Sequence, residues 1–254
     1  MIDVMGIKKK KEKDLTLRGH LIELRQRLIW SVIAVAITTI VCFVFGNRII
    51  DFFQSRAPED IEFVAIEVTE KVVTYMKVCL YGGVALALPF LVYQMVMFIH
   101  PALTSKEKKY LYLLMPGVVL FFAAGVAFAY FVFLPTALDF LLKGPWVSDV
   151  EARPSIGNYI SLITRMLVAT GLIFQIPLLI YFLSRIGVIN PQWLSKFRKF
   201  AFVGAFIISA IVTPTPDPIN QTIVAIPILL LYEIGILLSK LAWRQRGSPV
   251  ESQV

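Results

Sequence analysis

The stretch His20-Leu-Ile-Glu23-Leu-Arg25-Gln-Arg27 stands directly before the first long apolar run of the chain, which covers residues 28–45. If this stretch is helical, Glu23 and Arg27 lie on one face at a spacing of four, and a stripe of leucines lies on another. The apolar stripe can lie along a membrane surface while the polar stripe faces the cytosol. Such a lead-in is usually only a membrane anchor, so a further role requires a second acidic site at the same membrane level.

The composition of the chain indicates an integral membrane protein. Of its 254 residues, 57% are hydrophobic and 17% are charged, and the mean hydropathy is +0.75. This predicts an all-α polytopic membrane protein. The net charge of +8 does not indicate a nucleic-acid partner, because Lys and Arg gather in short segments between apolar runs. The two cysteines and two histidines form no metal-binding motif, so we expect neither a metal nor a cofactor.

Six apolar segments predict six transmembrane helices. They cover about residues 28–45, 75–99, 110–134, 159–183, 199–214 and 219–239. The last two are short: roughly fourteen residues in the fifth segment extend over about 21 Å as a helix, whereas a bilayer core is about 30 Å thick. We expect this short hairpin to thin the bilayer locally or to be shielded by partner proteins.

The distribution of charge predicts the topology. Lys and Arg concentrate before the first span, in the even-numbered connections and after the last span, whereas the odd-numbered connections are rich in acids. By the positive-inside rule, both termini face the cytosol. We therefore divide the chain into a basic cytosolic tail (1–16), a six-span membrane domain (17–243) and a cytosolic C-terminal tail (244–254). The polar sequence after Lys8–Lys11 predicts no cleavable signal.

Enzymatic activity is the first function class that the sequence argues against. It contains no GxSxG, no HExxH, no pair of membrane-embedded aspartates and no Gly-rich phosphate loop. The pair Gly82-Gly83 lies inside an apolar span, where small residues usually allow helices to pack closely. We expect no catalytic residues.

A secondary transporter for a small solute or ion is the alternative function, and it would use Glu233 and Arg165. Transporters place ionisable groups near the bilayer midplane and often contain internal repeats. No clear repeat is present, and Arg165 is close enough to the end of its span to reach the interface. Glu233 and Gln175 are deeper; either could bond a neighbouring helix or offer a partner helix a buried attachment point.

A membrane receptor for a polypeptide is the third class. Glu23 and Glu107 are the acids closest to the membrane on the predicted cytosolic side, which otherwise carries Lys and Arg. Two carboxylates at this level, near Phe98, can bind guanidinium groups through bidentate, charge-assisted hydrogen bonds. Glu107 alone would mean little, because solvated loops carry acids freely.

Several motifs occur together in a specific order and spacing over about residues 17–243. They are His20-Leu-Ile-Glu23-Leu-Arg25-Gln-Arg27, Phe98-Ile-His-Pro101-Ala-Leu103 with Glu107, Gly125-Val-Ala-Phe-Ala-Tyr130-Phe, Phe174-Gln-Ile-Pro177, Thr213-Pro-Thr-Pro-Asp217 with Gln221, and Tyr232-Glu233-Ile-Gly235. In these motifs the chain resembles the TatC family of the twin-arginine protein translocase. One departure is Gln175, where the family often has Glu, because an amide cannot carry a charge.

The resemblance implies a receptor and core subunit that binds the twin-arginine signal peptides of folded precursors. It also implies recruitment of single-span TatA-type and TatB-type subunits and export driven by the proton-motive force. The chain would work in a larger complex that contains further copies of itself, in the lipid bilayer of a prokaryotic cytoplasmic membrane. Glu23 and Glu107 would recognise the arginine pair, and Arg25, Arg27 and Phe98 would line that site.

The same resemblance assigns two residues to the outer side of the membrane. Pro58 would lie in the outer cap loop, and Asp217 would lie in the outer turn of the short hairpin.

Overall fold

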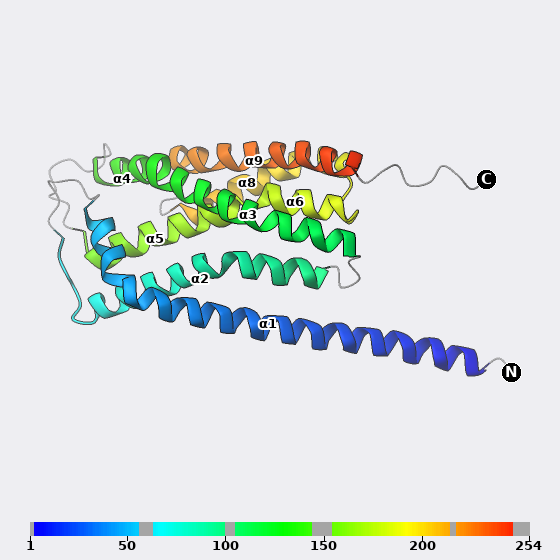
Figure 1. Cartoon of the computed structure of the whole chain (residues 1–254). Helices are drawn as coiled ribbons and strands as arrows, with labels where there is room; N and C mark the ends of the chain where they lie inside the picture. Colours follow the sequence, from blue (N-terminus) through cyan, green and yellow to red (C-terminus); the bar gives the residue numbers. More distant parts are fainter. Residues whose placement is uncertain (1–2, 56–62, 100–104, 144–153, 214–216, 246–254) are drawn as a thin grey trace.

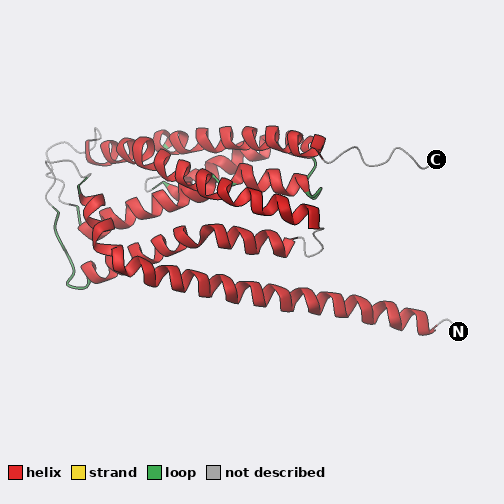
Figure 2. Ribbon diagram, in the orientation of Figure 1, coloured by secondary structure: helices red, strands yellow, loops and turns green. Residues whose placement is uncertain are grey.

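The computed structural model describes residues 3–55, 63–99, 105–143, 154–213 and 217–245. Within helices, side chains are described except at residues 3–18, 20, 99, 105–114, 142–143 and 245. In these ranges the regular elements are helices (Figure 1; Figure 2), and an isolated parallel bridge joins Val64 to Ser155. The all-α prediction is confirmed.

Nine α-helices and one π-helical turn follow one another along the described chain. They are α1 (Asp3–Gln54), α2 (Glu70–Ile99), α3 (Ser105–Phe128), the π-helical turn (Ala129–Phe133), α4 (Leu134–Lys143), α5 (Ile156–Ile173), α6 (Ile176–Arg185), α7 (Pro191–Lys196), α8 (Arg198–Val212) and α9 (Pro218–Gln245). α1 begins and α9 ends at the same end of the bundle (Figure 1), which we call the termini end. The opposite end, where α2 and α5 begin, is the far end.

Five segments of the described chain are long and apolar enough to cross a membrane. They are Leu21–Gln54, Glu70–Phe98, Met115–Leu141, Ile156–Arg185 and Pro218–Arg244. The remaining predicted span is α8, whose 15 residues extend over only about 22 Å. The fifth span is therefore short, as predicted. The sixth span, which we also predicted to be short, covers 27 residues and is long enough to cross a membrane, so that part of the prediction is wrong.

The third span is longer than its sequence suggested. We expected it to end at about Leu134, but the apolar helical segment continues to Leu141. Pro135 lies in the first turn of α4, directly after the π-helical turn. The Leu134 N–H still donates to the Ala129 carbonyl in the pattern of the π-helical turn, and the helix continues through Pro135, which has no N–H to donate.

The first helix is also longer than predicted and runs straight beyond the bundle (Figure 1). The predicted basic tail forms its first turns from Asp3 onwards. The stretch around Glu23 is collinear with the first span and does not turn aside from it, although its amphipathic pattern would also allow it to lie along a membrane surface. No helix-breaking residue separates the two, which explains this continuity.

Small residues bring the helices close together. A Cβ added at Gly83 would lie 2.7 Å from the Thr39 Cα, so α1 and α2 require a glycine at this position. At the same crossing the Thr38 hydroxyl donates to the Gly83 carbonyl at 2.7 Å. The interpretation of Gly82-Gly83 as a packing feature is confirmed.

The main core lies around α5, which is surrounded by α2, α3 and α8. Phe133, Ile160, Ile163 and Met166 are fully buried there. α1 packs chiefly against α2 and leaves most of its apolar side chains exposed. The surface available to lipid or to partners is therefore concentrated on the outer helices.

Candidate functional site

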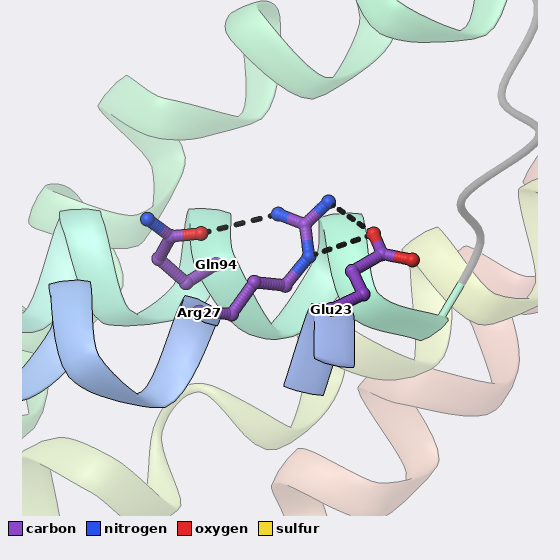
Figure 3. A network of polar contacts seen from close by, with 3 residues as sticks. All are labelled: Glu23, Arg27 and Gln94. Atoms are coloured by element: carbon purple, nitrogen blue, oxygen red, sulfur yellow. Dashed lines mark hydrogen bonds and ion pairs between the residues drawn. The ribbon is translucent and has the colours of Figure 1, made fainter. Parts of the chain in front are cut away.

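A polar network joins α1 to α2 near the termini end (Figure 3). Glu23 Oε1 accepts hydrogen bonds from Arg27 Nε at 2.9 Å and from Arg27 Nη2 at 2.6 Å. The third guanidinium nitrogen, Nη1, donates to Gln94 Oε1 at 3.1 Å. The Glu23 carboxylate thus already holds a guanidinium group through two donors.

Helical spacing and helix packing together produce this network. Glu23 and Arg27 are four residues apart on α1, so their side chains meet on one face. Gln94 is 9% exposed and lies on the α2 face that packs against α1. The Glu23 and Arg27 side chains are 29% and 20% exposed. At such exposure an ion pair contributes only about 0–1 kcal/mol to stability.

Glu23 retains binding capacity. Both bonds from Arg27 reach Oε1, and in the described part of the chain no hydrogen bond reaches Oε2. A carboxylate can accept several hydrogen bonds on its two oxygens. The network can therefore accept another cationic donor without first breaking apart.

The other residues predicted for this site lie near the network to different degrees. Phe98 is half-buried on α2, one turn beyond Gln94, so it shares that side of the helix. Arg25 is exposed on α1 and, two positions from Glu23, lies on a different face. Glu107 is in the first turn of α3, and its side chain is outside the described residues.

Gln175 lies inside the bundle at the break between α5 and α6. It is 3% exposed, and its Nε2 donates to the Val118 carbonyl on α3 at 3.2 Å. Pro177 in the first turn of α6 cannot continue the hydrogen bonding of α5, which explains the break. Gln175 therefore joins the break between α5 and α6 to α3, and we call this contact the intramembrane brace.

Glu233 is on the surface of α9. Its side chain is 47% exposed, and Oε2 accepts a hydrogen bond from Arg198 Nη2 at 2.7 Å. Arg165, the other residue of the transporter hypothesis, is exposed on α5. In the part of the chain that the structure describes, no contact links Arg165 to Glu233, so the structure does not bring the two residues of this hypothesis together.

Asp217 begins the last helix at the far end. Its Oδ1 accepts from the backbone N–H of Asn220 at 2.7 Å, and its Oδ2 accepts from Asn220 Nδ2 at 3.0 Å. This contact caps the N-terminus of α9. Pro58, predicted for the outer cap loop, is outside the described residues.

Sequence reasoning missed two residues that organise the ends of the bundle. Gln94 completes the network around Arg27, but a single amide in an apolar span gave no sign of which helix it would face. Glu70 accepts hydrogen bonds from the Ser155 hydroxyl and from the Gly157 backbone N–H. It thereby joins the start of α2 to the start of α5, about 85 residues apart along the chain.

Known proteins share this architecture. The family model of the Sec-independent protein translocase protein (TatC) matches residues 19–227. A TatC of Aquifex aeolicus is 40% identical over 237 residues, covering 91% of this chain and 98% of that protein. The Bacillus subtilis protein TatCy is 31% identical and covers 96% of this chain and 97% of its own length.

A solved structure agrees in fold. The crystal structure described as the twin arginine translocase receptor TatC superimposes with a TM-score of 0.76 at 41% identity, and the match covers 88% of this chain and 99% of that chain. The fold and the carboxylate network define a multi-pass helical membrane protein with a polar network at one end. The chain belongs to the TatC family, the twin-arginine translocase receptor subunits.

Proposed function

We propose that this chain binds the twin-arginine signal peptides of folded precursor proteins at Glu23 and Glu107, on the cytosolic side of the membrane. The observation that carries the proposal is the contact in which two nitrogens of the Arg27 guanidinium donate to Glu23 Oε1. Glu23 already binds a guanidinium group from its own chain, and a guanidinium is the group that the arginines of the signal peptide present.

The network suggests how a signal peptide engages the site. A guanidinium from the peptide donates first to the unoccupied Glu23 Oε2. It then competes with Arg27 for Oε1, while Gln94 Oε1 keeps hold of Arg27. Because the Glu23–Arg27 pair is part-exposed, separating it costs about 1 kcal/mol or less. A bidentate bond to a better-shielded guanidinium contributes more than this.

Glu107 supplies the second carboxylate in this proposal. Its place in the first turn of α3 favours a negative charge, because the helix dipole is positive there. Phe98, on the same side of α2 as Gln94, offers an apolar surface to the peptide. Because the receptor offers two carboxylates, it prefers a signal peptide that presents two arginines.

Partner recruitment takes place elsewhere on the molecule. α9 carries exposed apolar side chains on either side of Glu233, including Leu230 and Leu237 at 59% and 63% exposure. An apolar helix face with one exposed carboxylate suits a single-span helix with its own polar group, in keeping with TatA-type and TatB-type subunits. Gln175, which is buried against α3, acts as an intramembrane brace.

The remaining parts of the proposal concern the setting of the protein. The termini end is cytosolic, because it carries most of the Lys and Arg. The chain functions in a prokaryotic cytoplasmic membrane, in a larger complex that contains further copies of itself. It acts by binding and assembly, without catalysis, and the proton-motive force drives export.

Signal-peptide affinity tests this function. The purified chain in nanodiscs is titrated with a twin-arginine peptide and with its twin-lysine counterpart. Glu23→Ala and Glu107→Ala should each weaken binding of the arginine peptide by about ten- to a hundredfold. The lysine peptide should bind more weakly to the unaltered chain, since lysine lacks the planar fork.

A control distinguishes recognition from general electrostatics. Glu67→Ala removes an exposed acid at the far end and should leave both peptides unaffected. Photo-crosslinking from Phe98 should capture the arginine peptide. If Glu23→Ala and Glu107→Ala both retain the full arginine preference, these acids are not the recognition site.

A further inference from the structure

A cavity of about 500 Å³ opens at the far end of the bundle, remote from the Glu23 network. α2 contributes Lys77 and Tyr81, α4 contributes Leu138, and α5 contributes Asn158, Leu162 and Arg165. Its walls therefore combine two cations and a neutral amide with apolar side chains. The signal-binding function leaves this combination unexplained.

The two cations lie at similar depths. Lys77 is seven residues after the start of α2, and Arg165 is nine residues after the start of α5, which places them about 10 Å and 13 Å along helices that both begin at the far end. α2 and α5 pack side by side. Lys77 and Arg165 thus lie on two walls of one cavity, near the outer boundary of the proposed membrane.

Neither the topology nor a partner among the described residues explains these charges. The positive-inside rule places cations at the termini end, and these two lie at the opposite end. Both side chains are exposed, and in the described part of the chain neither takes part in an ion pair. Near the ends of their spans, both side chains can extend their charged groups to the interface, where an anionic ligand can reach them.

Exposed apolar side chains follow the two cations along α2 and α5, in the direction of the termini end. On α2, Leu80 follows Lys77 by three positions and is 50% exposed. On α5, Leu172 follows Arg165 by seven positions, lies on the same face and is 43% exposed. A ligand that matches this surface has an anionic head beside the cations and an apolar chain directed inward.

We propose that the Lys77–Arg165 cavity binds an anionic phospholipid of the outer leaflet. Its phosphate would lie between the two cations and accept a further hydrogen bond from Asn158, and an acyl chain would follow Leu80 or Leu172. Lysine and arginine both bind phosphate well. A zwitterionic lipid would bind less well, because its own ammonium group competes for the phosphate.

Lipid binding to the full chain in detergent tests this site. Dioleoylphosphatidylglycerol is added, and retained lipid is counted by native mass spectrometry while thermal unfolding is followed in parallel. The unaltered chain should retain this lipid in preference to dioleoylphosphatidylcholine. The double variant Lys77→Gln/Arg165→Gln should need about tenfold more phosphatidylglycerol for the same occupancy and thermal shift.

Two matched variants control for charge and for folding. Arg48→Gln/Lys71→Gln also removes two exposed cations near the far end, outside the cavity, and should bind lipid as the unaltered chain does. Lys77→Arg/Arg165→Lys keeps both charges and should bind phosphatidylglycerol normally, even if the glutamine variant is unstable. Inorganic phosphate and glycerophosphoglycerol, which lack acyl chains, should give no thermal shift at the same concentrations.

Three results would overturn the proposal. They are equal lipid retention by the Lys77→Gln/Arg165→Gln variant, an equal loss in Arg48→Gln/Lys71→Gln, or a full effect from phosphate without acyl chains. If the Lys77→Gln/Arg165→Gln variant loses partner co-purification but binds lipid unchanged, the two cations bind a protein helix that carries an acid and do not bind a lipid. None of these readouts uses a signal peptide, so the site stands or falls independently of the Glu23 proposal.

Discussion

Two glutamates at opposite ends of the bundle join neighbouring segments in different ways. Glu70, at the far end, uses both carboxylate oxygens. Oε1 accepts from the Ser155 hydroxyl and from the Gly157 N–H at 2.6 Å, and Oε2 accepts from the Ile66 N–H at 2.7 Å and the Glu67 N–H at 3.3 Å. Three of these four donors are backbone groups, whose positions the fold determines.

Glu23, at the termini end, uses only one oxygen. Its donors both belong to the side chain of Arg27, which can rotate away without disturbing the backbone. The comparison suggests a general distinction. A carboxylate saturated by backbone donors is a structural clasp, whereas a carboxylate held by one mobile side chain is suited to exchange its partner for a ligand.

The largest expected effect is the loss of stability on breaking the clasp. Glu70→Ala leaves the Gly157, Ile66 and Glu67 N–H groups without their carboxylate partner and separates α2 from the start of α5. We expect the thermal unfolding temperature in detergent to fall by several degrees, with signal-peptide affinity changed less than twofold. Glu67→Ala removes a carboxylate that makes no contact among the described residues, and it should leave the unfolding temperature unchanged. An equal fall in both variants would contradict the role of Glu70 as a clasp.

Partner recruitment should show the next largest effect. Glu233→Ala removes the exposed carboxylate of α9, and interhelical hydrogen bonds in membranes contribute about 0.6–2 kcal/mol. Co-purification of single-span partners should therefore fall by about threefold or more. Arg198→Gln frees Glu233 from its ion pair and should not reduce recruitment. Loss of signal binding with normal recruitment in Glu233→Ala would contradict this assignment.

Removing Arg27 should have a smaller effect, of opposite sign. Arg27→Gln frees Glu23 Oε1 from its internal guanidinium, a pair that contributes about 1 kcal/mol or less. Affinity for the arginine peptide should rise by about two- to fivefold in an equilibrium titration. Arg25→Gln removes an equal charge from another face of α1 and should not increase affinity. A tenfold weakening in Arg27→Gln would show that Arg27 supports the peptide and does not compete with it.

The smallest effect is expected at Gln175. Gln175→Leu loses the bond to the Val118 carbonyl but also removes Oε1, a buried oxygen with no hydrogen-bond partner in the described structure. These changes nearly cancel, so the free energy of unfolding should change by less than about 1 kcal/mol. Gln175→Glu should destabilise more, since an ionised carboxylate has no N–H to donate to Val118. A loss in Gln175→Leu well above 1 kcal/mol would contradict this balance.

The sequence predicted the all-α architecture and the short fifth span because both depend on apolar runs and on length. It also predicted that Glu23 and Arg27 meet, since helical spacing alone brings them together. It could not predict the contact with Gln94, which depends on the register of α1 against α2. Nor could it distinguish Glu70 from the other acids of its loop, because the donors to Glu70 come partly from a distant helix.

A double-mutant cycle between receptor and peptide tests the central claim most directly. Affinities are measured for the unaltered chain and for Glu23→Gln, each with a twin-arginine peptide and with peptides in which either arginine is replaced by lysine; Glu70→Gln provides the control receptor. We predict that Glu23→Gln reduces the cost of one particular arginine-to-lysine change by about tenfold, whereas Glu70→Gln leaves both costs unchanged. If both arginine-to-lysine changes cost as much in Glu23→Gln as in the unaltered chain, Glu23 does not contact the signal arginines and the account is wrong.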